Sequence, residues 1–342
     1  MRFRSSLRFT LPVLGLLALL PHCKTAPSTE SSATASASAS APPSATAPAL
    51  PPFQVPTAAP VAVPTQLKVT STGATPRREL RYKYKGAKET DMTMELGMSV
   101  QMGMAGQSGV PVVLPSTRVT MHVTPKAVSD GGDLSYEFDI VKLDVATDSK
   151  AAPPIVTAMK TSMDKLKGTH GSGVVSNLGE SKSISVSVSP DVPPQVRELM
   201  DRMRQQLGEL SVQLPTEAVG KGAEWEKTSG FMANGLLVEQ TAKYTLTSLE
   251  GEVMKLSVSV TQKAQPQEIK APGLPPGSKV YLETLDASGS GDATRDMTKL
   301  VGSSTIAVKS KTTSRVSQAG KEAPMTMNIE VSTTIAPASA SK

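Results

Sequence analysis

The most constraining feature of this sequence is a strict two-residue alternation over residues 92–104. The odd positions there carry Thr, Glu, Gly, Ser and Gln, whereas every even position is apolar. The apolar set is Met92, Met94, Leu96, Met98, Val100, Met102 and Met104. Because successive side chains of a strand point to opposite faces, this pattern predicts one long strand with a methionine-rich face of roughly 40 Å.

Similar alternation recurs between residues 66 and 336, which predicts about ten strands, mostly joined as hairpins. The clearest examples are residues 80–84, 119–123, 184–188, 242–246, 254–260 and 325–331. Along 134–145 the phase shifts by one at Val141, which predicts a β-bulge. Glycine-containing stretches at 130–132, 250–251 and 289–291 are interpreted as turns.

Two stretches have a helical period instead. Residues 153–166 and 192–207 each carry one apolar stripe, and Asp191 is a plausible N-cap for the second. The stripes are Ile155, Met159, Met163 and Leu166 in the first, and Val196, Leu199, Met200, Met203 and Leu207 in the second. The predicted fold is therefore mainly β with two helices (α+β): a curved antiparallel sheet or half-barrel with the helices on its concave face. Gly171–Gly179 before strand 184–188 resembles Gly289–Gly302 before strand 306–308, so the domain is interpreted as two related halves.

The N-terminus has the pattern of a lipoprotein signal peptide. Arg2, Arg4 and Arg8 precede an apolar stretch over residues 10–20, and Leu20 stands three residues before Cys23. Cys23 is the single cysteine of the chain, which excludes an intrachain disulfide. We expect residues 1–23 to form the signal peptide and Cys23 to be acylated, although Pro21 and His22 stand where small residues are usual. Several acyl chains would anchor the protein stably to a membrane.

Residues 24–65 are rich in Ala, Ser, Pro and Thr, and predict a disordered tether. Residues 66–336 then form a single β-rich domain, and residues 337–342 a short disordered tail. Lys24, where an Asp would retain a lipoprotein at the inner membrane, favours the outer membrane. The expected location is the cell envelope, with a lipid anchor and the domain facing the periplasm.

Composition argues against several classes of function. The net charge of +6 is modest and evenly spread, so nucleic acid is not expected as a partner. The domain has two histidines, His122 and His170, and no cysteine, which excludes ordinary zinc spacing. No nucleophile elbow, phosphate loop or assignable carboxylate pair appears. We therefore expect no enzyme activity, no catalytic residues, no cofactor and no dedicated metal site.

Three hypotheses account for the methionine-rich strand. In the first, the strand lines a cavity for an apolar or amphipathic ligand such as a lipid acyl chain, since methionine suits varied apolar partners. The residues expected to line that cavity are Met92, Met94, Met98, Met102, Leu199, Met203 and Trp225. In the second, the methionines are filled core of a structural or protein-interaction lipoprotein, because aromatic residues make up only 3% of the chain. In the third, Met-x-Met pairs bind Cu(I), with His122 as an imidazole partner.

Two short motifs resemble a recurring pattern of secreted lipoproteins. They are Tyr82-Lys-Tyr84-Lys-Gly86, and Val219-Gly-Lys-Gly222-Ala-Glu-Trp225 after the second predicted helix. This Gly-x-x-Trp element between two β-rich halves resembles uncharacterised secreted lipoproteins of myxobacteria, and the resemblance spans most of residues 78–336. That family is similar to the lipoprotein carriers of the Lol system and to mycobacterial lipid-binding lipoproteins. The resemblance implies a strongly curved antiparallel sheet around helices with an apolar cavity, and it assigns no functional residue.

Overall fold

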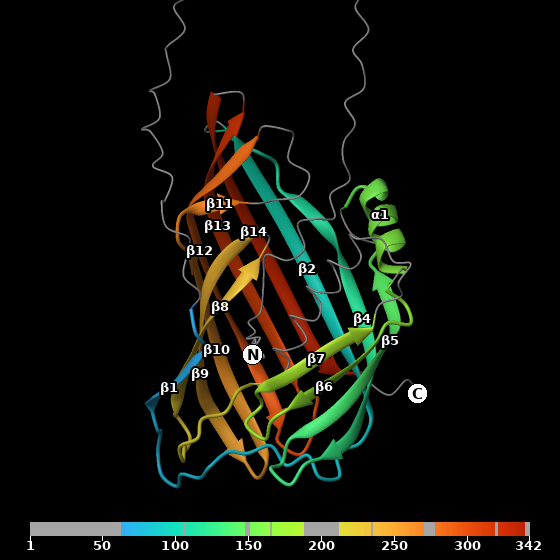
Figure 1. The fold of residues 1–342 in the computed structure, drawn as a ribbon, viewed down its shortest axis with the longest axis vertical. Coiled ribbons are helices and arrows are strands. Elements are labelled where there is room, and N and C mark those ends of the chain that lie inside the picture. The colour runs from blue at the N-terminus through green and yellow to red at the C-terminus, as the bar shows by residue number, and fades with distance from the viewer. Residues whose placement is uncertain are drawn as a thin grey trace, which may run out of the picture.

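The computed structural model describes residues 63–104, 107–147, 151–164, 166–187, 212–233, 235–269, 278–318 and 321–338. These residues form one antiparallel sheet of fourteen strands and one helix (Figure 1). The first half contains β1 (Gln66–Ser71), β2 (Thr90–Met104), β3 (Gln107–Ser108), β4 (Val112–Val128), β5 (Leu134–Val145), α1 (Pro153–Asp164), β6 (His170–Val175) and β7 (Ser181–Ser187). The second half contains β8 (Glu224–Ala233), β9 (Leu236–Glu250), β10 (Val253–Ala264), β11 (Gln267–Ile269), β12 (Lys279–Asp296), β13 (Ser303–Gln318) and β14 (Lys321–Pro337).

The sheet consists of two hairpin meanders joined along one seam. The strand order is β1-β8-β9-β10-β12-β13-β14-β2-β4-β5-β6-β7, with β11 paired to β12 and β3 to β2. At the seam, β14 pairs with β2 from Met325 opposite Met104 to Pro337 opposite Met92. The first meander is thereby held to the second by the last strand of the chain.

The sheet is bent, because strands from both ends of this order share one core. Leu134 of β5 and Val175 of β6 belong to the same buried cluster as Trp225 of β8 and Leu256 of β10. In Figure 1, β6 and β7 turn back across the front of the sheet. We call the side that carries these buried residues the inner face and the opposite side the outer face.

Helix α1 lies against β4 and β5. Met159 is its buried residue, and Met163 packs on a core cluster that contains Met92 and Met121. The first of the two predicted helices is therefore present. The second, over residues 192–207, lies outside the described residues.

Several sequence predictions are confirmed. The mainly β class is correct, and β2 is a single strand over the whole methionine-rich stretch. The register shift between β4 and β5 leaves Val141 without a partner opposite, which is the predicted bulge. Turns occur at residues 130–131 and 251–252.

Two predictions are wrong. Residues 80–84 are not a strand but an extended segment that crosses the core, where Leu80, Tyr82 and Tyr84 are buried. The stretch 289–291 is not a turn but the middle of β12. A Cβ on Gly291 would lie 2.0 Å from the carbonyl oxygen of Thr305 on β13. That glycine is there because the neighbouring backbone lies too close for a side chain.

Candidate apolar binding face

The apolar side chains of β2 lie on the inner face and pass from buried to exposed along the strand. Met92 is 1% exposed and Met98 is buried, whereas Met102 is 46% and Met104 is 55% exposed. Met94 is half-buried between these extremes. One strand therefore carries methionines from the core to the surface at one end of the sheet, which we call the methionine end.

Strand β14 supplies a second row of apolar side chains beside them. Met327 lies directly opposite Met102, and Met325 lies opposite Met104. Directly opposed residues on antiparallel strands have Cβ atoms about 4.5–5.5 Å apart. The four methionines therefore form one patch, which we call the methionine quartet. Its two pairs, Met102 with Met104 and Met325 with Met327, are more than 220 residues apart in the chain.

Exposed apolar residues concentrate at this end of the molecule. Among the described residues, five of the eight exposed large apolar side chains come from the end of β2, the start of β4 or the segment between them. They are Met102, Met104, Val110, Val112 and Val113. Met102, Met104 and Val112 lie on the inner face, whereas Val113 is on the outer face opposite Ser99.

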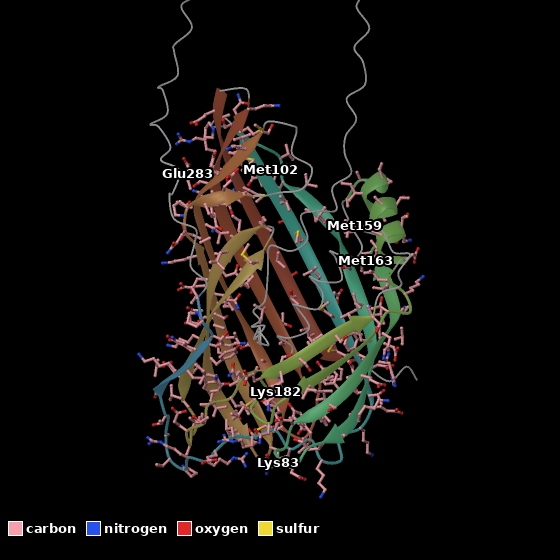
Figure 2. The ribbon with its side chains drawn as sticks, in the orientation of Figure 1. Lys83, Met102, Met159, Met163, Lys182 and Glu283 are labelled. Carbon is pink, nitrogen blue, oxygen red and sulfur yellow. The ribbon has the colours of Figure 1, made fainter. Side chains whose placement is uncertain are left out.

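Charged groups border the same end on the outer face. Figure 2 shows Glu283 at the same end of the molecule as Met102, while Lys83 and Lys182 lie at the opposite end. Glu283 accepts hydrogen bonds from the Nη2 and Nε atoms of Arg315 at 2.6 and 3.1 Å. Glu322 accepts a hydrogen bond of 3.2 Å from Nη1 of the same guanidinium. The hydrogen bonds that Arg315 donates to Glu283 and Glu322 raise its pKa, and the cluster fixes β12 to the β13–β14 hairpin.

A row of polar side chains crosses the inner face next to the methionine quartet. Ser229, Gln240, Gln262, Ala287 and Ser310 lie opposite one another in register from β8 to β13. The same row continues into Ile329 of β14 and Val100 of β2. The four polar members of this row are each less than one-tenth exposed. Sequence reasoning missed this row, because its members are scattered over four strands whose register the sequence does not reveal.

Trp225 is fully buried on the inner face, two inward positions along β8 from Ser229 on the side away from the methionine end. Its indole Nε1 donates to the carbonyl oxygen of Gln213 at 3.0 Å, and its ring stacks on Tyr244 with centroids 5.6 Å apart. The indole is thus held by the protein itself. A part for Trp225 in ligand binding stays a prediction. Leu199, Met203 and Cys23 lie outside the described residues.

His122 does not lie beside Met92 and Met94, so its predicted part in a copper site is wrong. Met92 pairs with Met121 on the inner face, whereas His122 is the next residue of β4 and points outward. On the outer face, Asp91, His122, Asp139 and His170 form a row across β2, β4, β5 and β6. The Nδ1 atoms of His122 and His170 lie 2.7 and 2.9 Å from Asp91 and Asp139.

In the part of the chain that the structure describes, no helix is long and apolar enough to cross a membrane. Within the same residues, no group of three or more His, Cys, Asp or Glu side chains is arranged to hold a metal ion.

No family model matches the chain, and no curated protein matches it either. Among solved structures, the chain is similar to a loop L8 deletion mutant of OmpT, an outer membrane protein of Vibrio cholerae, with 8% identity and a TM-score of 0.19. It is also similar to in-vitro folded OmpT of the same organism in its trimer form, with 7% identity and a TM-score of 0.15. Each likeness covers 72% of this chain and 99% of the other. Because both TM-scores are low, the function proposed below is argued from the residues alone.

Proposed function

We propose that this protein binds an apolar or amphipathic ligand, such as a lipid, on the inner face of its sheet at the methionine end. The observation that carries the proposal is the course of β2, whose apolar side passes from Met92 in the core to Met102 and Met104 at the surface. A row of this kind offers an apolar chain a continuous path from solvent into the domain.

The residue type fits this task. Methionine is unbranched and polarizable, so it adapts to apolar partners of varied shape at little cost. A face that had only to fill a core would more often use Leu, Ile and Val, whose rotamers are better defined. The quartet contributes four flexible thioethers at the point where a ligand would enter.

In this proposal the sheet acts as a half-barrel, with α1 and a second helix over residues 192–207 on its concave face. The domain is held at the outer membrane, facing the periplasm, by acyl chains on Cys23 and the tether 24–65. It carries no catalytic group and needs no cofactor. Ligand binding, and not a reaction, is then its activity.

The test compares methionines of the inner face with an exposed methionine of the outer face. We expect the full chain, stripped of lipid on an apolar resin, to bind a fluorescent uncharged lipid analogue. Met102→Gln together with Met327→Gln should weaken that binding about tenfold or more, because polar amides replace two apolar contacts. The control is Met232→Gln on β8, which is 54% exposed on the outer face and should leave binding unchanged.

Mass spectrometry of lipid extracted from the purified chain identifies the natural ligand. A protein that carries no lipid and binds no probe would instead be a structural or protein-interaction lipoprotein. If the Met232 variant lost as much affinity for the probe as the quartet variant, the probe would be binding to apolar surface without specificity.

Binding of Cu(I) is a second candidate, favoured by the pairing of the quartet across β2 and β14. Thioethers are soft ligands that select Cu(I). Titration of the full chain with Ag(I) or Cu(I) under reducing conditions tests it. We expect one equivalent to bind if the quartet is a metal site, and Met325→Leu with Met327→Leu to abolish the binding. The control pair Met92→Leu and Met94→Leu, away from the quartet, should retain it.

A further inference from the structure

The inner face carries buried hydroxyl groups that have no hydrogen-bond partner among the described residues. They are Oγ of Ser229 on β8, Oγ of Ser310 and Oγ1 of Thr312 on β13. All three side chains are less than one-tenth exposed. Buried polar groups in folded proteins are almost always hydrogen-bonded, so each exception needs an explanation.

These hydroxyls belong to one polar patch. Ser229 lies opposite Gln240, which accepts a hydrogen bond of 2.7 Å from Nε2 of Gln262 on the next strand. Ser310 continues the same row, and Thr312 stands one inward position further along β13. We call Ser229, Gln240, Gln262, Ser310 and Thr312 the polar patch. On β9 and β10 it is flanked by the apolar side chains of Val238, Ala242 and Val260.

The polar patch adjoins the proposed ligand path. Thr312 lies opposite Met327 in register, and Met327 lies opposite Met102. Ser310 lies opposite Ile329 of β14, and Ile329 lies opposite Val100 of β2. From Val100 the apolar side of β2 runs on to Met92, a length of roughly 26 Å at 3.3 Å per residue. A ligand with its polar group at the patch would therefore lay its apolar chain along this side of β2.

The patch consists of hydroxyl and carboxamide groups. Lys227 of β8 lies on the same face next to Ser229, but it is four strands away from Ser310 and Thr312. Hydroxyls and amides both donate and accept hydrogen bonds. An ionised phosphate or carboxylate placed at Ser310 and Thr312 would be desolvated without a countercharge beside it, which is strongly unfavourable. A neutral hydroxyl, ester or amide would instead satisfy the buried hydroxyls and be satisfied by them.

We propose that the polar patch binds the uncharged polar group of an amphipathic ligand whose apolar chain lies along the methionines of β2. This inference rests on the proposed function and narrows the ligand to neutral amphiphiles of the monoacylglycerol or acyl amide kind. It assigns the hydroxyls of Ser310 and Thr312 as specificity-determining groups.

The test uses three probes with the same twelve-carbon chain and the delipidated full chain. Monolaurin has a neutral polar group, laurate an ionised one, and dodecane none. We expect monolaurin to bind about tenfold more tightly than dodecane, the effect of one or two neutral hydrogen bonds. In Ser310→Ala with Thr312→Val, monolaurin should lose that advantage while dodecane binds as before. The control pair Ser288→Ala with Thr326→Val alters exposed residues of the outer face and should keep the preference.

Each outcome separates this inference from the proposed function. Equal binding of monolaurin and dodecane, or a preference for laurate, overturns the role of the polar patch and leaves apolar binding intact. Failure of all three probes to bind overturns the proposed function and this inference with it.

Thermal unfolding of the ligand-free protein adds an independent readout. The Ser310→Ala, Thr312→Val variant should unfold at the same or a higher temperature than the unaltered protein, because it removes hydroxyls that lack partners. A marked loss of stability would show that these hydroxyls bond to the chain itself, and would overturn the inference.

Discussion

The imidazole Nδ1 of His122 lies 2.7 Å from Oδ1 of Asp91, a contact that joins the outer faces of β4 and β2. The hydrogen bond to Asp91 is the largest cause that raises the pKa of His122, and the nearby charges of Asp91, Glu89 and Asp139 act in the same direction. The folded protein therefore holds the proton on His122 more tightly than the unfolded chain does. This stabilisation is fully present below the ordinary histidine pKa of about 6.5 and is lost as pH rises through the raised value.

Replacing Asp91→Asn should lower the pKa of His122 towards its ordinary value, because the amide cannot stabilise the imidazolium as a carboxylate does. The Asp91→Asn variant should therefore gain less stability than the unaltered protein when the pH is lowered through the raised pKa of His122. An NMR titration of the His122 ring and urea unfolding at several pH values measure the two effects. Asp130→Asn, in an exposed turn, is the control. An unchanged His122 pKa in the Asp91 variant would contradict this account.

The two ends of the methionine row should respond differently to truncation. Met92→Ala removes a side chain that is 1% exposed and should cost about 2–5 kcal/mol of unfolding free energy, as a cavity forms in the core. Met102→Ala removes one that is 46% exposed and should cost about 1 kcal/mol or less. Urea denaturation followed by circular dichroism compares them. Equal losses of unfolding free energy in the two variants would mean that the Met102 side chain is buried in solution.

The methionine row also shows how far the sequence predicts the structure. Alternation over 92–104 was sufficient to predict the strand and its apolar face, and the phase shift over 134–145 predicted the bulge at Val141. It could not show which strand lies beside β2, because Met325 and Met327 are brought there only by the return of the last strand. The alternation over 119–123, in which His122 stands between Met121 and Val123, was enough to place His122 on the face opposite to Met92.

The same limit applies to Gly289 and Gly291. Two glycines around a serine predict a turn when only local preference is considered. In the structure they stand within β12, where the β13 backbone approaches too closely for a Cβ. Strand packing, which is not a local property, overrides the turn preference at this place.

Gly291→Ala should therefore destabilise the protein although alanine is normally tolerated in strands. The added Cβ would lie 2.0 Å from the carbonyl oxygen of Thr305 and 2.7 Å from Cα of Ile306, so the backbone must shift. We expect a loss of about 1–3 kcal/mol, typical of overpacking. Gly131→Ala, whose Cβ would meet no atom closer than 3.8 Å, is the matched control and should change stability by about 0.5 kcal/mol or less.

Replacing Trp225→Phe should cost about 2–4 kcal/mol, because it leaves the Gln213 carbonyl without its donor and a small void beside Tyr244. Chemical denaturation measures the loss. Binding of the fluorescent uncharged lipid analogue by the folded variant should be unchanged. If the variant kept its stability but lost the probe, Trp225 would be a wall of the ligand site and not part of the closed core.

The seam between β14 and β2 governs when the domain can be completed. Its partners are separated by more than 220 residues, so the first meander waits for the last strand before its β2 edge is paired. Contacts of such long sequence range form slowly, since a large loop must close first. During synthesis, β2 thus remains without its neighbour β14 until the C-terminal end of the chain arrives. A chaperone that covers β2 in this interval would protect the chain from aggregation at this strand.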